Sequence, residues 1–254
     1  MLIDLSDQVV VVSGGGRGIG RAIVERFVNE GARVIALDLA FPDALPPEVA
    51  ALECDVRDPA SVQGAIAEVV ARFGRIDVLV NNAGINVEGA VETLDPERWR
   101  AAFDVNVLGT FLLSQAVIPV MKAAHRGRII NAASFAAIVP SVGAAAYGAS
   151  KAAVVQFTRV LASELGPWDI TVNAYAPGMV PTAMNGFAEL PEAAQSRLLD
   201  TLSLRRWETP DDVADLLCFL ASDRAGYITG ALLDVSGGKL ATQMPSRAYE
   251  ALLG

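Results

Sequence analysis

The chain has little cysteine and histidine. Its 254 residues include Cys54, Cys218 and one histidine, His125. Two cysteines inside strand-like and helix-like runs predict small core residues rather than a disulfide framework, so we expect a reducing, cytoplasmic setting. His125 lies in the basic segment 122–128 and is expected to be exposed. A Ser-His-Asp triad is therefore excluded unless His125 lies at the centre of the active site. The chain has no His, Cys and acid cluster with metal-ligand spacing, so no metal site is predicted.

Long apolar runs and basic clusters are also lacking. The apolar runs are short and interrupted by Gly, Pro or charge, which predicts no membrane span. The first residues have no basic start followed by a long apolar segment, so we expect no signal peptide. A net charge of −9 makes nucleic acid and anionic membranes poor partners. The 52% of hydrophobic residues instead favours a large folded core.

Short β-branched runs alternate with helix-periodic segments, which is typical of a parallel sheet covered on both faces. Strands are predicted at 9–12, 33–37, 52–56, 76–80, 128–132, 171–174 and 232–235. Helices are predicted at 21–30, 59–73, 95–111, 148–165 and 210–221, the last after a cap at Thr209. We therefore predict one α/β, doubly wound Rossmann-type domain over 1–254 with a mostly parallel seven-stranded sheet, a substrate lid at about 183–208 and a tail at about 240–254.

A glycine-rich loop joins the first strand to the first helix, over residues 14–20 (GGGRGIG). Glycines allow a tight turn and close approach of a pyrophosphate, whose charge meets the helix N-terminus. The second strand ends in Asp38, where a carboxylate can bond adenosine ribose hydroxyls and would repel the 2′-phosphate of NADP. Arg17 could instead reach that phosphate, or be solvated. We predict NAD, with NADP less favoured.

Other polar residues follow strand ends. Asp55 could meet an adenine with Val56, or simply cap the helix at 59–73. The small residues of the Asn82-Ala83-Gly84 turn would let a cofactor lie against the backbone. Asn106 is an amide in an apolar helical stretch, where it could also serve only a helix bend or a neighbouring carbonyl.

The stretch 134–151 holds Ser134, Tyr147 and Lys151. Tyr and Lys at i, i+4 extend from one helix face. An ammonium beside a phenol favours the phenolate, which would let Tyr147 act as a general acid and base. Ser134 follows a strand, at the sheet edge where doubly wound folds bind ligands.

In order and spacing these motifs resemble the short-chain dehydrogenase/reductase family over almost the whole chain. Residues 13–20 match its glycine motif, with Ser where Thr is commoner, and Asn81 to Gly84 match its strand-four motif. Its catalytic tetrad is matched by Asn106, Ser134, Tyr147 and Lys151. The resemblance implies cofactor contacts from Ser13, Gly14, Arg17, Gly18, Ile19, Gly20, Asp38, Asp55, Val56, Asn82, Ala83, Gly84, Tyr147, Lys151, Pro177, Gly178, Val180 and Thr182.

The resemblance also implies roles. Tyr147 would exchange the substrate proton while hydride passes to the nicotinamide. Lys151 would lower the tyrosine pKa and hold the nicotinamide ribose, and Ser134 would orient the substrate oxygen. Asn106 would bind a water in a proton relay. Members are usually homotetramers, for which segments 148–165 and 228–235 could serve here.

Several substrates stay open. One is a sugar, polyol or other small polar alcohol oxidised with NAD. Another is reduction of a 3-oxoacyl carrier protein, because the basic segment 122–128 resembles that of the carrier-protein reductases. Those reductases commonly have a basic residue where 166–169 has none, and they usually prefer NADP, which Asp38 disfavours. A non-catalytic dinucleotide-binding sensor or structural protein is a third reading, against which the complete tetrad argues. Arg247 in the tail could bind a polar or anionic substrate, or the tail could pack at a subunit interface.

Overall fold

Seven parallel strands form one sheet in the computed structural model, which describes residues 3–182, 185–239 and 241–250. The strand order is β3-β2-β1-β4-β5-β6-β7, and every strand pairing in this part of the chain is parallel. The strands are β1 Val9–Ser13, β2 Arg33–Asp38, β3 Ala50–Glu53, β4 Val78–Asn81, β5 Gly127–Ala132, β6 Ile170–Pro177 and β7 Leu232–Val235. The order reverses beside β1, so the predicted doubly wound sheet is confirmed.

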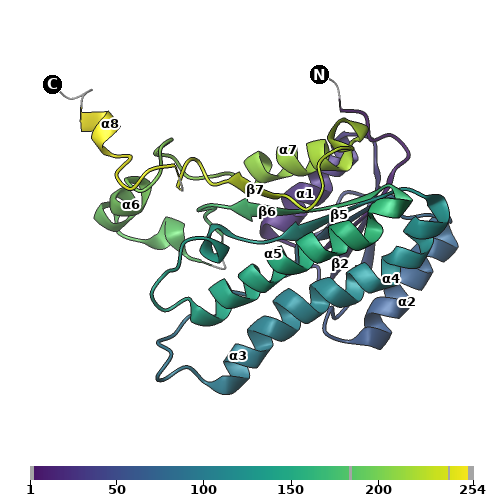
Figure 1. Ribbon diagram of the computed structural model, residues 1–254, viewed down its shortest axis with the longest axis horizontal. Coiled ribbons are helices and arrows are strands. Elements are labelled where there is room, and N and C mark those ends of the chain that lie inside the picture. The colour runs from purple at the N-terminus through teal and green to yellow at the C-terminus, as the bar shows by residue number, and fades with distance from the viewer. Residues whose placement is uncertain (1–2, 183–184, 240, 251–254) are drawn as a thin grey trace.

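Helices cover both faces of this sheet (Figure 1). The main helices are α1 Gly18–Asn29, α2 Pro59–Phe73, α3 Pro96–Phe103, α4 Gly109–Ala124, α5 Ala145–Leu165, α6 Glu192–Leu199, α7 Pro210–Ala221 and α8 Arg247–Glu250. Alternate strand residues feed separate cores: Val10 and Val12 pack with α1 and α7, while Val9 and Val11 pack with α2, α4 and α5. Burial on both faces explains why these strands read as continuous apolar runs.

Several element bounds differ from the prediction by a few residues, and two differences bear on the predicted site. The third strand ends at Glu53, paired with Asp38 at the end of β2, so Cys54, Asp55 and Val56 lie beyond it rather than in it. The helix predicted at 95–111 continues through α4 to Ala124. A π-helical turn, Asp104–Leu108, interrupts its regular hydrogen-bonding pattern. The sequence pattern does not reveal that turn, because a single wider turn leaves the chain helical on both sides of it.

The same helical run qualifies the expectation that no segment resembles a membrane span. Residues Pro96–Ala124 are long and apolar enough to cross a membrane by length and composition, and 39% of the most apolar window is buried inside the protein. Core helices of soluble proteins meet the same criterion, and Leu113, Val117 and Met121 of this helix lie in the core beneath the sheet. This is therefore weak evidence for a span.

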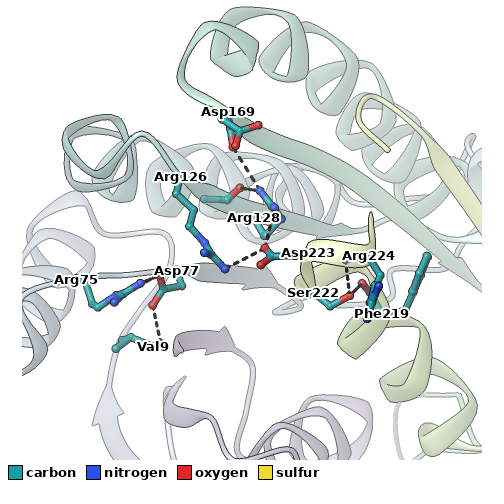
Figure 2. A network of polar contacts seen from close by, with 11 residues as sticks. Val9, Arg75, Asp77, Arg126, Arg128, Asp169, Phe219, Ser222, Asp223 and Arg224 are labelled. Carbon is teal, nitrogen blue, oxygen red and sulfur yellow. Dashed lines mark hydrogen bonds and ion pairs between the residues drawn. The ribbon is translucent and has the colours of Figure 1, made fainter. Parts of the chain in front are cut away.

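Hydrogen bonds and ion pairs link the strands and loops at the amino-terminal edge of the sheet (Figure 2). The Asp77 carboxylate accepts the Val9 N–H at 2.9 Å and pairs with Arg75. Buried Arg128 lies 3.4 Å from the Asp223 carboxylate and donates to the Asp169 carbonyl at 3.3 Å. The predicted site residues lie at the opposite edge, where the strands end.

Candidate active site

The carboxyl ends of the parallel strands bring the predicted motifs to one edge. The glycine loop follows β1, Asp38 ends β2, and Asn82 follows β4. Ser134 lies just beyond β5, and Pro177 ends β6. Segments far apart in sequence are therefore neighbours here, because a parallel sheet places every strand end on the same side.

The glycine loop folds tightly against the turn after β4. Gly14 has a φ of +65°, and a Cβ there would lie 2.8 Å from the Cα of Ala83. A Cβ on Gly20 would lie 1.9 Å from the Gly14 carbonyl oxygen, so no residue with a side chain fits at this position without a backbone shift. A Cβ on Gly18 would lie 4.0 Å from Thr182 Cγ2. The loop therefore faces the segment after β6, so the two predicted cofactor motifs lie near each other.

The N-terminus of α1 has no side-chain cap, as is also true of α5 and α6. Its N-cap residue, Arg17, makes no side-chain capping bond, and its first turn holds no acid. By contrast Asp58, Asp95 and Thr209 cap α2, α3 and α7 with their side chains. The first amides of α1 are thus left for an acceptor from elsewhere, which fits a pyrophosphate.

Asp38 is held beside this loop. Its carboxylate accepts the Gly16 N–H at 2.9 Å and the Leu39 N–H at 2.8 Å. Arg17 is exposed and takes part in no ion pair within the described part of the chain. The arrangement fits the predicted bonds from Asp38 to ribose hydroxyls.

Ser13 and Asn82 face inward. The buried Ser13 hydroxyl accepts the Asn82 and Ala83 N–H groups, both at 3.1 Å. The Asn82 amide donates to the Ser13 and Gly14 carbonyls at 3.1 and 3.2 Å. Its oxygen accepts from the Tyr175 hydroxyl at 3.0 Å. These side-chain bonds shape the loop and the turn, and the cofactor contacts predicted at Ser13 and Asn82 stay predictions.

Asp55 is engaged locally. Its carboxylate lies 2.7 Å from the Arg57 guanidinium, whose hydrogen bonds hold the Asp55 pKa below its usual range. The suggested cap of α2 by Asp55 is wrong, because Asp58 accepts the Ala60 N–H there. Val56 is buried against Gly109.

Ser134, Tyr147 and Lys151 converge as predicted. Helix α5 begins at Ala145, three residues before the predicted start at 148, and so includes Tyr147. Lys151 Nζ lies 5.8 Å from the centre of the Tyr147 ring and donates to the Ala132 carbonyl at 2.7 Å. That carbonyl belongs to the end of β5, two residues before buried Ser134.

Burial shifts both titratable groups toward their neutral forms. It lowers the Lys151 pKa to about 8. It also raises the Tyr147 pKa, which the nearby Ser134 hydroxyl partly opposes. The net shift of Tyr147 is upward, opposite to the expected lowering by Lys151, because desolvating the phenolate outweighs the favourable contacts within the protein itself.

Asn106 lies in the π-helical turn, and both the oxygen and the nitrogen of its side-chain amide are hydrogen-bonded. Its oxygen accepts the Ile85 N–H at 2.9 Å, and its amide donates to the Ile85 carbonyl at 3.1 Å and to Ser150 Oγ at 2.9 Å. Ser150 donates in turn to the Tyr147 carbonyl at 2.7 Å. Asn106 therefore satisfies neighbouring backbone groups and braces the Tyr147 turn. Sequence reasoning missed Ser150, since serine in a helix carries no spacing signal.

Glu208 and Asn185 hold the segment after β6, and both were missed. Buried Glu208 accepts the Gly178 N–H at 2.6 Å, and its own N–H donates to the Met179 carbonyl at 3.2 Å. Its Oε1 is buried without a hydrogen-bond partner among the described residues, and burial raises its pKa to about 8. Asn185 donates to the Val180 carbonyl at 2.7 Å and accepts the Thr182 N–H at 3.2 Å.

The predicted lid and tail lie together at one end of the molecule, where α6 and α8 are neighbours (Figure 1). Phe187 stacks on Trp207 with ring centres 5.7 Å apart. The Tyr249 hydroxyl donates to the Ser203 carbonyl at 2.7 Å, so the tail contacts the lid. The Arg247 side chain makes no hydrogen bond or ion pair within the described ranges. The parts of the lid and tail predictions at 183–184, 240 and 251–254 lie outside those ranges.

The two cysteines and the histidine lie away from this site. Cys54 and Cys218 are free and buried, as predicted. His125 is exposed at the end of α4, also as predicted. No group of three His, Cys, Asp or Glu side chains that could hold a metal ion occurs in the described part of the protein.

Comparisons with known proteins place this geometry in context. A family model described as Enoyl-(Acyl carrier protein) reductase matches residues 14–239. The chain is 37% identical over 243 residues to the 3-oxoacyl-[acyl-carrier-protein] reductase of Thermotoga maritima, covering 92% of this chain and 98% of that protein.

Other relatives carry different names. A Rhizobium meliloti protein named "Probable galactose dehydrogenase" is 37% identical over 245 residues, which covers 92% of this chain and 96% of that one. The solved structure of gox2181 superposes with a TM-score of 0.88 at 33% identity, covering 94% of this chain and 98% of that one. The likeness spans nearly the full length of each protein.

Proposed function

The chain belongs to the short-chain dehydrogenase/reductase family, and on that premise we propose that it transfers hydride between NAD and a secondary alcohol or ketone. The observation that carries this proposal is the convergence of Ser134, Tyr147 and Lys151 beside an uncapped helix N-terminus. Its relatives are oxidoreductases, so an enzyme acting on a CH–OH group is the class the comparisons support.

Cofactor binding in this proposal uses groups already in place. The first amides of α1 would bind the pyrophosphate, and Asp38 would bind the adenosine ribose hydroxyls. The segment 177–182, held by Glu208 and Asn185, would contact the nicotinamide amide. When bound, the nicotinamide supplies or accepts the hydride. The carboxylate at position 38 favours NAD over NADP.

Proton handling falls to Tyr147 and Lys151 of α5 and to Ser134 just beyond β5. Tyr147 would take the proton of the substrate hydroxyl in oxidation and return it in reduction. Ser134 would donate to the substrate oxygen and stabilise its developing charge. Lys151 would hold the nicotinamide ribose. Because burial raises the Tyr147 pKa, oxidation should speed up as pH rises, and ketone reduction should be favoured near neutral pH.

For the substrate we propose a sugar, polyol or other small polar alcohol. The carboxylate at Asp38 supports an NAD-dependent oxidation, and the relative named for galactose supports a polar alcohol. Reduction of a 3-oxoacyl carrier-protein thioester is the second candidate, supported by the Thermotoga maritima relative. Against it, Arg126 and Arg128 both lie near the Asp223 carboxylate, and residues 166–169, just before β6, include no basic side chain.

The test is Tyr147→Phe. It should lower turnover by roughly 1,000-fold or more while leaving the NAD dissociation constant nearly unchanged, because only the proton-transfer group is lost. Tyr227→Phe is the matched control, since Tyr227 is fully exposed at 104%. Turnover that survives in Tyr147→Phe would overturn the mechanism.

Substrate class is read from a screen of polyols, sugars, secondary alcohols and a 3-oxoacyl thioester with NAD and NADP. Faster reduction of the thioester with NADPH than oxidation of any polar alcohol with NAD would favour the second candidate. A protein that binds NAD and turns over none of the panel would support a sensor or structural role instead.

A further inference from the structure

Lys239 follows Gly237 and Gly238 at the carboxyl end of β7, on the same sheet edge as Ser134. Its N–H donates to the Ser236 hydroxyl at 3.2 Å, which directs the chain there. The backbone also contacts the lid, because Leu204 donates to the Gly237 carbonyl at 3.0 Å and Ser203 Oγ to the Gly238 carbonyl at 3.1 Å. The root of this side chain is therefore fixed between β7 and the lid.

The side chain is half-buried, and its ammonium lies between two walls. Nζ donates to Thr201 Oγ1 at 2.7 Å, two residues beyond the end of α6. It also lies 5.1 Å from the centre of the Phe135 ring, and Phe135 directly follows Ser134. The cation therefore lies between the lid and the segment that carries the proposed substrate-orienting serine.

This ammonium has no acidic partner within the described ranges, although the chain has 29 acidic and only 20 basic residues. The ion pairs there are all made by arginine. An ammonium has three donor hydrogens, and only one of those of Lys239 has an acceptor among the described residues, which is Thr201 Oγ1. Burial lowers its pKa, with no neighbouring acid opposing the shift. Half-burying an unpaired charge is costly unless a further partner joins it.

We propose that Lys239 binds a carboxylate of the substrate, at the end remote from the reacting hydroxyl. This assignment rests on the proposed function and narrows its substrate class to hydroxy acids. One ammonium beside one hydroxyl matches a single negative charge, whereas a phosphate dianion would need more positive charge than this net-acidic chain places there. Lys239, rather than Arg247 of the tail, is the cation that the structure brings next to the Ser134 segment.

The experiment compares hydroxy acids, with the hydroxyl at carbon 2, 3 or 4, with their neutral primary amides. Wild type should prefer at least one acid over its amide by roughly 10- to 100-fold in kcat/KM, because a charge-assisted hydrogen bond is lost in the amide. Lys239→Gln should bring this ratio near unity, and Lys239→Arg should retain part of it. Arg197→Gln, which removes an exposed cation of α6, should keep the wild-type ratio.

The variant Thr201→Val distinguishes a structural role of Lys239 from substrate binding, because it removes the contact with the lid and keeps the charge. The acid preference should survive in that variant. A wild-type ratio near one across the series, or a Lys239→Gln variant that keeps the acid preference, would overturn the assignment.

Calorimetric titration of the same acids and amides into the NADH-bound protein repeats the comparison without turnover. Lys239-dependent acid binding without hydride transfer would contradict the proposed function alone. Turnover of amides and acids alike would contradict Lys239 recognition alone.

Discussion

At the scale of single residues, burial decides which ionised forms this site tolerates. Lys151 and Glu208 both have pKa values shifted to about 8, one downward and one upward, because each loses hydration. The positions of Tyr147 and Lys151 follow from helical spacing, whereas the direction of the Tyr147 shift does not. Sequence spacing predicts which groups meet but carries no measure of desolvation.

Glu208 should make stability depend on pH. Its pKa is raised from 4.5 to about 8, so the folded protein binds the extra proton between those values. Its contribution to the free energy of unfolding is fully present below about pH 4.5. This contribution, at most about 5 kcal/mol, is lost as pH rises through 8. Glu208→Gln removes this dependence, so wild type should lose stability relative to the variant between pH 5 and 8.

Urea unfolding at matched protein concentration measures that difference. Glu192→Gln, at an exposed position in α6, is the control and should track wild type at every pH. A Glu208→Gln difference that stays constant from pH 5 to 8 would show that Glu208 ionises freely in the folded protein.

Asp38 should set cofactor preference. Asp38→Asn keeps the shape but removes the charge beside Gly16. The kcat/KM with NAD should fall roughly 10-fold and the NADP to NAD ratio should rise, since the repulsion of the 2′-phosphate is gone. Steady-state kinetics with both cofactors measures this. Asp43→Asn, in the exposed loop that follows, should leave the NADP to NAD ratio unchanged. An unchanged ratio in Asp38→Asn would show that Asp38 does not set cofactor preference.

At the scale of elements, caps and prolines made some boundaries predictable. Helices α2 and α7 occupy their predicted ranges because Asp58 or Thr209 caps each start and proline follows. The third strand was misplaced because its end depends on pairing with β2, which local composition does not record. The π-helical turn around Asn106 was missed for a similar reason, since Ile85 and Ser150 come from other elements.

The junction of the glycine loop and α1 should not tolerate a side chain. Gly20→Ala would place a Cβ 1.9 Å from the Gly14 carbonyl oxygen, so the loop must shift. We expect a loss of about 3 kcal/mol in stability and weaker NAD binding. Gly64→Ala, at an exposed position of α2 with no atom within 4 Å of the new Cβ, should gain about 0.5 to 1 kcal/mol in stability. Thermal unfolding and NAD titration compare the pair, and equal effects would contradict the expectation.

At the scale of the whole molecule, an apolar surface on α4 and α5 favours self-association. Phe111 and Val160 are 42% and 49% exposed, and Phe111 meets Phe157 edge to face across the two helices with centres 6.3 Å apart. Leu108 in the preceding π-helical turn is 38% exposed. Exposed apolar side chains on two packed helices favour association with another surface, and the homotetramer that the family resemblance implies stays a prediction.

Charge on that surface should break the assembly. We expect wild type to be a tetramer, and Phe111→Lys with Val160→Glu to give smaller species in light scattering after gel filtration. Val91→Lys, at a 76% exposed residue on another surface, is the control and should leave the mass unchanged. A double variant with the wild-type mass would place the interface elsewhere.

Local sequence was enough to predict the parallel sheet, the glycine loop and the order of Ser134, Tyr147 and Lys151, because strand patterns, tight turns and i, i+4 pairs depend on neighbouring residues. Three-dimensional packing added Glu208 beneath Gly178, Lys239 beside Phe135 and the upward shift of the Tyr147 pKa. Each of these depends on burial or on segments that meet only when the strand ends come together. Desolvation and long-range contact are properties of the assembled fold, and no residue spacing encodes them.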